Sequence, residues 1–209
     1  MSKKLAIIGS GDLAKLISFH AGLLGYDIFG YFDDFAAKGN EVFDGKEVKD
    51  TIDNIEYYEN EFDFIIIGIG YKYLRFRKKI YNKLSTKFKF LNIIHKSVVI
   101  CSSVQIGDGN LILPGCVFDD GVNIGNNNVF NTGVIIAHDT SVSSHSFYGP
   151  GVNLAGFVVL GECCFFGINS TIIDNITICD DVQTGGGAVI TKNIMESGLY
   201  LGVPATKYR

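Results

Sequence analysis

The chain contains only four histidines, and one of them stands in a pattern that suits acid–base chemistry. His138 is followed at once by Asp139, and a carboxylate beside an imidazole can fix its tautomer and raise its basicity, as a general base requires near neutral pH. His20 falls within a predicted helix and His95 at a predicted domain junction. His145 is interpreted as a neighbour of the site or as a surface residue. The residues alone therefore indicate one candidate base, His138.

The elements that would position His138 come from a six-residue repeat that begins near residue 97. Three such repeats close one triangular coil of about 18 residues, and known solenoids of this type wind left-handed. We therefore predict a left-handed parallel β-helix. Large apolar residues occupy every sixth position over fourteen repeats: Ile100, Ile106, Ile112, Phe118, Ile124, Phe130, Ile136, Val142, Tyr148, Leu154, Leu160, Phe166, Ile172 and Ile178.

The positions two residues before each large one, at the corners of this predicted solenoid, hold mostly small or β-branched residues. His138 comes two residues after Ile136 of the repeat, so its side chain should point outward where the coil turns. Glycine follows several of the large residues, and we expect it to supply the left-handed backbone angles of the turns. These glycines are Gly107, Gly125, Gly161 and Gly167.

The first 96 residues follow a different pattern, in which short apolar strands alternate with helices. A glycine turn, Gly9-Ser10-Gly11, joins the first strand to the first helix. This layout predicts a Rossmann-like α/β domain over 1–96, followed by the β-helix domain with a C-terminal tail over 97–209. We predict strands at 5–8, 27–32, 64–67 and 90–94, and helices at 12–24 and from 73 to about 83.

Composition and charge favour small molecules as partners. The 209 residues are 47% hydrophobic, which is enough for a sizeable core. A net charge of -4 offers no basic surface for nucleic acid or for an anionic membrane. The N-terminal apolar run is too short for a signal peptide or a spanning helix, so we expect a cytoplasmic protein without membrane insertion. Five cysteines without a C-x-x-C pair suggest neither a disulfide framework nor a metal site.

Several short segments, taken in their order and spacing, resemble one known family. The chain is similar over its whole length to the hexapeptide-repeat sugar acetyltransferases with an N-terminal Rossmann-like domain, which N-acetylate nucleotide-activated 4-amino-4,6-dideoxy sugars in bacterial glycan synthesis. The segments that carry the resemblance are Gly9 to Lys15, Phe32-Asp33-Asp34, Ile67-Gly68, Ile94-His95-Lys96-Ser97, Asn131-Thr132, His138, Leu154-Ala155-Gly156, Phe166 to Ser170, Gly185 to Ala188 and Gly202 to Ala205.

The resemblance implies an N-acetyltransferase that uses acetyl-CoA as co-substrate and no metal. His138 would be the general base, and Asp139, where the family often has Glu, would raise its basicity. Asn131 would position the thioester or the amine. The amine would attack the acetyl carbonyl directly, and the backbone N–H of Gly156 would stabilise the oxyanion.

The resemblance also implies a homotrimer, because the CoA groove of the family forms between neighbouring β-helices. Lys192 would contact the phosphates of CoA, and Pro204 and Ala205 its adenine end. The residues expected to bind CoA are Gly156, Ile168, Gly186, Lys192, Pro204 and Ala205. Those expected to bind the nucleotide sugar are Gly11, Asp12, Leu13, Asp33, Asp34 and Gly68.

The chain departs from the common family pattern at two places. Gly11-Asp12-Leu13 stands where the pattern has Ser-Gly-His, which leaves uridine, thymidine and guanosine sugars all open. Phe147 stands where some relatives carry a His that touches the cofactor. The CoA contacts at that position must therefore differ.

Other functions stay open at this point. Gly9 to Ala14 fits the G-x-G-x-x-A motif of an NAD-dependent dehydrogenase, with Asp33 a little over twenty residues later, but the α/β part is short for a whole dinucleotide. A zinc hydratase would need a third histidine within the repeat. An O-acetyltransferase of a sugar or sialic acid is the main alternative, because the same base can activate an alcohol. A non-catalytic nucleotide-binding scaffold is another.

Overall fold

The structure is a computed structural model, and it describes residues 2–208. The chain divides into two compact units between Ile93 and Ile94, close to the boundary that we predicted after residue 96. Within the described residues, no helix has both the length and the apolar character needed to cross a bilayer.

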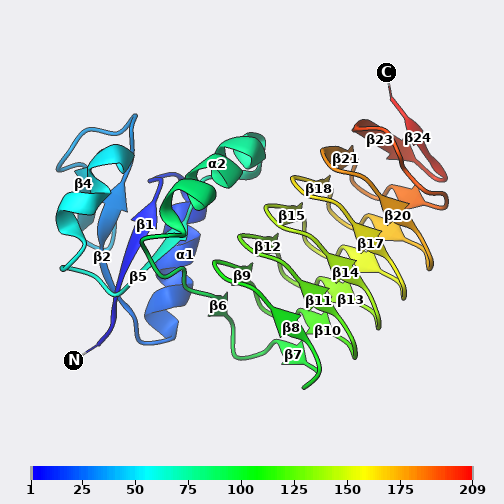
Figure 1. Ribbon diagram of the computed structural model, residues 1–209, viewed down its shortest axis with the longest axis horizontal. Helices are drawn as coiled ribbons and strands as arrows, with labels where there is room; N and C mark the ends of the chain where they lie inside the picture. The colour runs from blue at the N-terminus through cyan, green and yellow to red at the C-terminus, as the bar shows by residue number, and fades with distance from the viewer. Residues whose placement is uncertain (1, 209) are drawn as a thin grey trace. The chain divides into compact units, whose positions relative to one another are not determined.

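The first unit is a five-stranded sheet with the strand order β3-β4-β2-β1-β5, accompanied by helices (Figure 1). β4, β2, β1 and β5 run parallel, and β3 is antiparallel to β4. Because β1 lies between β2 and β5, the carboxyl ends of these three strands meet at one edge, where ligands bind in open α/β sheets. The elements are β1 (Lys4–Ile8), α1 (Asp12–Leu23), β2 (Asp27–Phe32), β3 (Glu41–Phe43), β4 (Lys46–Asp50), η1 (Ile52–Tyr58), β5 (Phe64–Ile67), η2 (Tyr71–Tyr73) and α2 (Leu74–Leu84).

Two features of this unit differ from the sequence prediction. The strand predicted at 90–94 is wrong: Phe90 makes only an isolated bridge to Ile65, and Ile93–Ile94 is β6, the first strand of a sheet in the solenoid. The reason is that Ile94 already lies in phase with the six-residue repeat. The β3–β4 hairpin was not predicted, because its strands are short and carry no alternation of apolar residues.

The second unit is a left-handed parallel β-helix, as predicted. Each large residue of the repeat is the second residue of a two-residue strand, and equivalent residues of successive coils lie in register. Ile100, Phe118 and Ile136 show this spacing on one side of the prism. The predicted coil of about 18 residues is therefore confirmed.

The three sides of the prism are called faces 1, 2 and 3, and the turns between them corners 1–2, 2–3 and 3–1 (Figure 1). Face 1 consists of β7 (Val99–Ile100), β10 (Val117–Phe118), β13 (Ile135–Ile136), β16 (Asn153–Leu154), β19 (Thr171–Ile172) and β22 (Val189–Ile190). Face 2 consists of β8 (Gln105–Ile106), β11 (Asn123–Ile124), β14 (Ser141–Val142), β17 (Val159–Leu160) and β20 (Thr177–Ile178). Face 3 consists of β6 (Ile93–Ile94), β9 (Leu111–Ile112), β12 (Val129–Phe130), β15 (Phe147–Tyr148), β18 (Phe165–Phe166), β21 (Val182–Thr184), β23 (Gly198–Gly202) and β24 (Ala205–Lys207).

The core of the prism is a column of stacked side chains from the repeat. On face 3, Phe130, Tyr148 and Phe166 stack with ring centroids 4.6 and 5.0 Å apart. The repeat continues beyond Ile178 to the buried Thr184, whose hydroxyl accepts a hydrogen bond from the Gly167 amide at 3.0 Å. The sequence pattern missed this coil because a threonine replaces the apolar residue.

The left-handed backbone angles fall at a different position from the one we expected. From Ile106 to Thr184, positive φ angles occur three residues after each core-facing residue, at Gly121, Asp139 and Phe157 among others. The glycines that directly follow large residues serve a different purpose: a Cβ atom on Gly125 would lie 2.9 Å from the carbonyl carbon of Ser143 on the next coil. They let successive coils approach closely. The glycines to which this correction applies are Gly107, Gly125, Gly161 and Gly167.

Candidate active site

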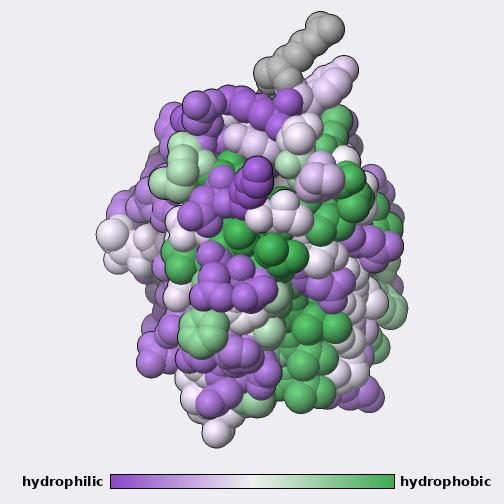
Figure 2. Space-filling model, turned by 90° about the vertical axis from the view of Figure 1, so that its right-hand side faces the viewer, coloured by the Kyte–Doolittle hydropathy of each residue, from purple (hydrophilic) through white to green (hydrophobic). Residues whose placement is uncertain are grey.

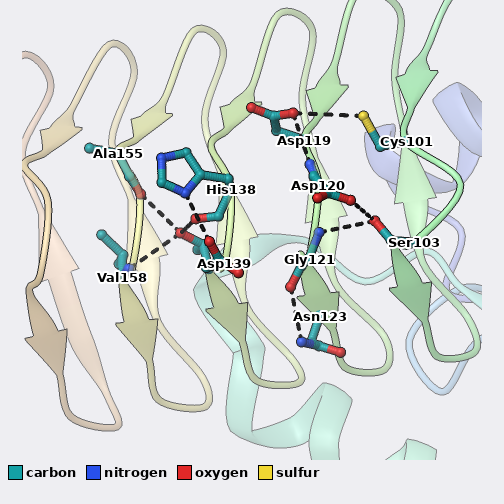
Figure 3. Close-up of polar contacts among 11 residues, drawn as sticks. Cys101, Ser103, Asp119, Asp120, Gly121, Asn123, His138, Asp139, Ala155 and Val158 are labelled. Carbon is teal, nitrogen blue, oxygen red and sulfur yellow. Dashed lines mark hydrogen bonds and ion pairs between the residues drawn. The ribbon is translucent and has the colours of Figure 1, made fainter.

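His138 and Asp139 lie at corner 1–2, in the turn between β13 and β14 (Figure 3). The imidazole Nδ1 and the carboxylate Oδ2 of Asp139 are 3.0 Å apart. A neutral imidazole that donates from Nδ1 keeps its lone pair on Nε2, where it can accept a proton. Both side chains are about half exposed, at 50% and 53%, so reactants can reach the ring.

The next coil supports the imidazole from one side. A Cβ atom on Gly156 would lie 2.7 Å from Cε1 and 2.8 Å from Nε2 of His138, so only glycine fits beneath the ring in this position. The ring of Phe157 meets the imidazole edge to face, with centroids 5.1 Å apart and planes at 88°. These two neighbours fix where the Nε2 edge lies.

The backbone of Gly156 lies next to this edge of the imidazole. Its carbonyl accepts a hydrogen bond from the Asn175 amide at 3.1 Å, whereas its N–H donates to no partner within residues 2–208. Gly156 is buried. A buried N–H beside a candidate base can stabilise negative charge on a bound ligand.

Phe157 is a site residue that our sequence reasoning missed. Its φ of 60° is unusual for an aromatic residue, and its side chain is 52% exposed. Equivalent turn positions in neighbouring coils hold residues that tolerate this angle, namely Gly121, Asp139 and Asn175. Phe157 lies one coil after Asp139 in the repeat, so comparing equivalent positions of successive coils would have identified it from the sequence.

The preceding coil adds negative charge to corner 1–2. Asp119 and Asp120 lie in the turn after β10, where Asp119 pairs with the thiol of Cys101 at 3.7 Å and Asp120 accepts a hydrogen bond from Ser103 (Figure 3). With Asp139, these two adjacent coils carry three carboxylates at corner 1–2. A cationic group is attracted to such a surface.

Asn131 lies at a different corner from His138. It precedes β13 at corner 3–1, and its side-chain amide donates to the carbonyl of Tyr148 at 2.8 Å. Ile168 and Gly186 share this corner on later coils, where a Cβ atom on Gly186 would lie 3.0 Å from Cγ2 of Ile168. Within one chain, face 1 therefore separates these residues from His138.

The remaining residues expected to bind CoA lie at two places. Lys192 is exposed at corner 1–2, three coils beyond His138 and in the same column as Gly156. Its ammonium has no partner within the described residues. Pro204 and Ala205 lie in the hairpin between β23 and β24, which extends face 3 at its C-terminal end.

In the first unit, Asp33 orders the carboxyl edge of the sheet. Its Oδ2 accepts hydrogen bonds from the amide and hydroxyl of Ser10 at 2.8 and 2.7 Å, and its Oδ1 accepts from the amides of Phe35 and Ala36. Burial acts to raise the pKa of Asp33, but these hydrogen bonds outweigh burial and lower it. Both carboxylate oxygens are thus engaged within the chain.

The N-terminus of α1 follows directly after the glycine turn. Gly11 is its N-cap, and no side chain caps the helix. The amides of its first turn therefore face the edge of the sheet, as in helix ends that bind phosphate. Asp12 is exposed, with Lys15 3.9 Å away, and Leu13 is partly buried.

Asp34 and Gly68 complete this edge in different ways. Asp34 is exposed; its Oδ1 accepts a hydrogen bond from the Ile52 amide at 2.9 Å, and its Oδ2 has no partner in the described part of the chain. Gly68 is buried, and a Cβ atom there would lie 2.8 Å from Cα and Cβ of Ala14. Asp34 is available to a ligand, whereas Gly68 allows β5 to pack against α1.

Comparison with known proteins gives matches to both units. Residues 4–84 match the family described as PglD N-terminal domain. PerB from Caulobacter crescentus, in complex with CoA and GDP-perosamine, superposes with a TM-score of 0.91 at 28% identity, over 99% of this chain and 97% of that chain. The acetyltransferase domain of PglB from Neisseria gonorrhoeae, in complex with acetyl coenzyme A, gives 0.89 at 26% identity over 100% of both chains.

A further Caulobacter crescentus structure is of a GDP-perosamine N-acetyltransferase variant in which a histidine is replaced by alanine; it covers 99% of this chain with a TM-score of 0.92 at 27% identity. The fold, the site and these matches define the chain as an acyltransferase of the hexapeptide-repeat β-helix class. Within this class, it resembles the nucleotide-sugar N-acetyltransferases, and its first unit matches the PglD N-terminal domain over residues 4–84.

Proposed function

We propose that this enzyme transfers the acetyl group of acetyl-CoA to the amine of a nucleotide-linked 4-amino-4,6-dideoxy sugar, with His138 as general base. The observation that carries this proposal is the imidazole at corner 1–2, which is paired with Asp139 through Nδ1 and has its Nε2 edge over Gly156. The bound CoA and GDP-perosamine of the Caulobacter protein, and the acetyl coenzyme A of the Neisseria domain, support the choice of substrates.

The geometry supports a direct transfer. The neutral amine attacks the acetyl carbonyl carbon, and the proton that the nitrogen loses moves to Nε2 of His138. The carbonyl oxygen becomes an oxyanion that accepts a hydrogen bond from the Gly156 N–H. Collapse breaks the C–S bond, the imidazolium returns the proton to the thiolate, and the products are the amide and CoA with a free thiol. Asp139 balances the charge of the imidazolium while it exists.

Two further groups act before the chemistry. The substrate amine arrives as an ammonium in neutral solution and loses a proton to solvent before it attacks; the carboxylates of Asp119, Asp120 and Asp139 attract it to the corner. In the first unit, the amides at the start of α1 bind the diphosphate, and Asp34 accepts hydrogen bonds from the base or the ribose.

We further propose that the active enzyme is a homotrimer. Four of the residues expected to bind CoA lie on opposite edges of face 1, with Gly156 and Lys192 at corner 1–2 and Ile168 and Gly186 at corner 3–1. A groove that includes all four requires corner 1–2 of one chain to meet corner 3–1 of another. Apolar side chains are exposed around these edges, and Figure 2 shows such side chains gathered into a band where the C-terminal coils face the viewer. The exposed apolar residues on face 1, on face 2 and at the two corners that border face 1 include Val99, Ile135, Phe157, Val159 and Ile168.

A trimer also explains how an exposed base could work. A half-exposed His138 leaves the thioester open to water, and a second chain over the corner would exclude it. The mass of the protein in solution, measured by light scattering, tests this assembly. This activity implies a cytoplasmic enzyme of bacterial surface-glycan synthesis.

The function is tested by release of the CoA thiol from acetyl-CoA in the presence of UDP-, dTDP- and GDP-linked 4-amino sugars, with hydroxyl sugars and sialic acid as comparison. We expect turnover with at least one amino sugar and none with the hydroxyl compounds. Turnover with a hydroxyl sugar alone would instead identify an O-acetyltransferase.

The role of His138 is tested in the same assay. His138→Ala should lower kcat by about 10²- to 10⁴-fold, the usual contribution of a general base. Asp139→Asn should also lower kcat, whereas Asp174→Asn, which removes an exposed carboxylate two coils further along the same corner, should not. Wild-type turnover by His138→Ala would reject the assigned base.

A further inference from the structure

Thr140 is an exception in the column of inward-facing residues at corner 1–2. In the other coils this column holds β-branched apolar residues, namely Val104, Val122, Val158 and Ile176. Thr140 is fully buried and immediately follows His138-Asp139 along the chain. A polar side chain therefore stands in this column only in the coil that carries the candidate base.

The hydroxyl of Thr140 is fully engaged by the next coil. It donates to the carbonyl oxygen of Ala155 at 2.9 Å and accepts a hydrogen bond from the amide of Val158 at 3.3 Å; dashed lines in Figure 3 mark both contacts. The accepting carbonyl belongs to the peptide group that joins Ala155 to Gly156. The N–H of that same peptide group is the amide beside His138.

A trans peptide group is planar, so its C=O and N–H point in opposite directions. A hydrogen bond that holds the Ala155 carbonyl toward the interior therefore turns the Gly156 N–H outward, to the side of the coil on which the half-exposed His138 side chain lies. Hydrogen bonds in a chain also polarise one another, so a donor to the carbonyl strengthens the N–H as a donor. The Thr140 hydroxyl therefore affects both the orientation of the Gly156 N–H and its strength as a hydrogen-bond donor.

We propose that Thr140 is a positioning residue, whose hydroxyl orients and polarises the Ala155–Gly156 peptide so that its N–H stabilises the oxyanion of the acetyl transfer. This inference rests on the proposed function and extends it by one residue. Thr140 touches no reactant, and it acts through the Gly156 amide.

The preceding coil has the same corner without a hydrogen bond from a side-chain hydroxyl to the corresponding backbone carbonyl. There Val122 takes the place of Thr140, and the carbonyl of Ala137 accepts no hydrogen bond from a side chain within residues 2–208. The β-helix thus accommodates valine in this column. Thr140→Val is therefore a conservative test that the fold itself supports.

The expected effect follows from the size of oxyanion stabilisation. One such donor contributes on the order of 10²- to 10³-fold to kcat, and polarisation by a neighbouring hydrogen bond changes a bond by roughly 10–30%. If the loss of polarisation removes roughly 10–30% of the free energy that the donor contributes, kcat should fall by about two- to eightfold in Thr140→Val. The KM for acetyl-CoA should not change, and Thr140→Ser, which keeps the hydroxyl, should restore kcat.

Ser146 offers a matched control at corner 2–3. Its buried hydroxyl accepts a hydrogen bond from the Cys164 amide at 3.0 Å, as the Thr140 hydroxyl does from Val158. Ser146→Ala should lower the melting temperature, as Thr140→Val does, and leave kcat unchanged. An equal fall of kcat in both variants would show a merely structural role and overturn the inference.

The orientation of the peptide is also tested without turnover. The amide resonance of Gly156 in a ¹H–¹⁵N spectrum should shift in Thr140→Val and return in Thr140→Ser; an unshifted resonance overturns the inference. If His138→Ala is inactive but Thr140→Val has the wild-type kcat, only this inference fails. If the wild-type enzyme transfers no acetyl group to any amino sugar, the proposed function fails and the catalytic role of Thr140 fails with it.

Discussion

Replacing Gly156 by alanine should remove most of the activity while the β-helix stays folded. The new methyl group would lie 2.7 Å from Cε1 and 2.8 Å from Nε2 of His138. Non-bonded carbon atoms prefer separations of about 3.5–4.0 Å, so the imidazole must move by about 1 Å. Gly156 does not have a positive φ, so alanine introduces no backbone strain there.

The size of the loss follows from this displacement. A misplacement of about 1 Å in a catalytic geometry costs on the order of 10²-fold in rate, which corresponds to about 2.7 kcal/mol of transition-state stabilisation. The loss should appear in kcat, measured by thiol release at saturating acetyl-CoA. The melting temperature should stay close to that of the wild type.

Two controls make the test specific to the imidazole. Gly22→Ala in α1 adds a methyl group with no atom within 4 Å, and it should leave kcat unchanged. Adding Gly156→Ala to His138→Ala should lower the residual rate little, because the substitution acts through the ring that is already missing. A kcat within about twofold of wild type for Gly156→Ala, or a full further loss in the double variant, would refute this reasoning.

Two further predictions concern ionisable groups. The lowered pKa of Asp33 stabilises the fold above the unfolded pKa of about 3.9, and this contribution is lost as the pH falls through the lower folded pKa. The free energy of unfolding of wild type should therefore exceed that of Asp33→Asn at pH 6, and the gap should shrink below about pH 4; a gap that stays constant down to pH 3 would argue against the hydrogen-bonded carboxylate. Burial raises the pKa of Cys116 to about 11 and that of Cys164 to about 12, so iodoacetamide at about pH 8 should leave both thiols unlabelled in the folded protein. Mass spectrometry should find both labelled after denaturation, and rapid labelling in the folded state would contradict their burial.

The sequence alone determined the architecture of the solenoid. A period of six places one residue of each strand inward, and three periods close a coil, so the pattern of Ile100 and its successors specified both the core and the position of the turns. The same count placed His138 outward at a corner beside Asp139, as the structure has it. The six-residue period by itself determines which side chains point into the core and which point outward.

The tertiary structure alone decided which coils and which atoms meet. Gly125 is required by a neighbouring coil rather than by its own backbone angle, and Asp33 is engaged by Ser10, a residue from another part of the chain. The roles of Phe157 and Thr140 also depend on contacts with residues one coil away, which the repeat predicts only when it is counted in whole coils. The physical reason is that periodicity sets the direction of a side chain, whereas contact depends on the close stacking of segments that are distant in sequence.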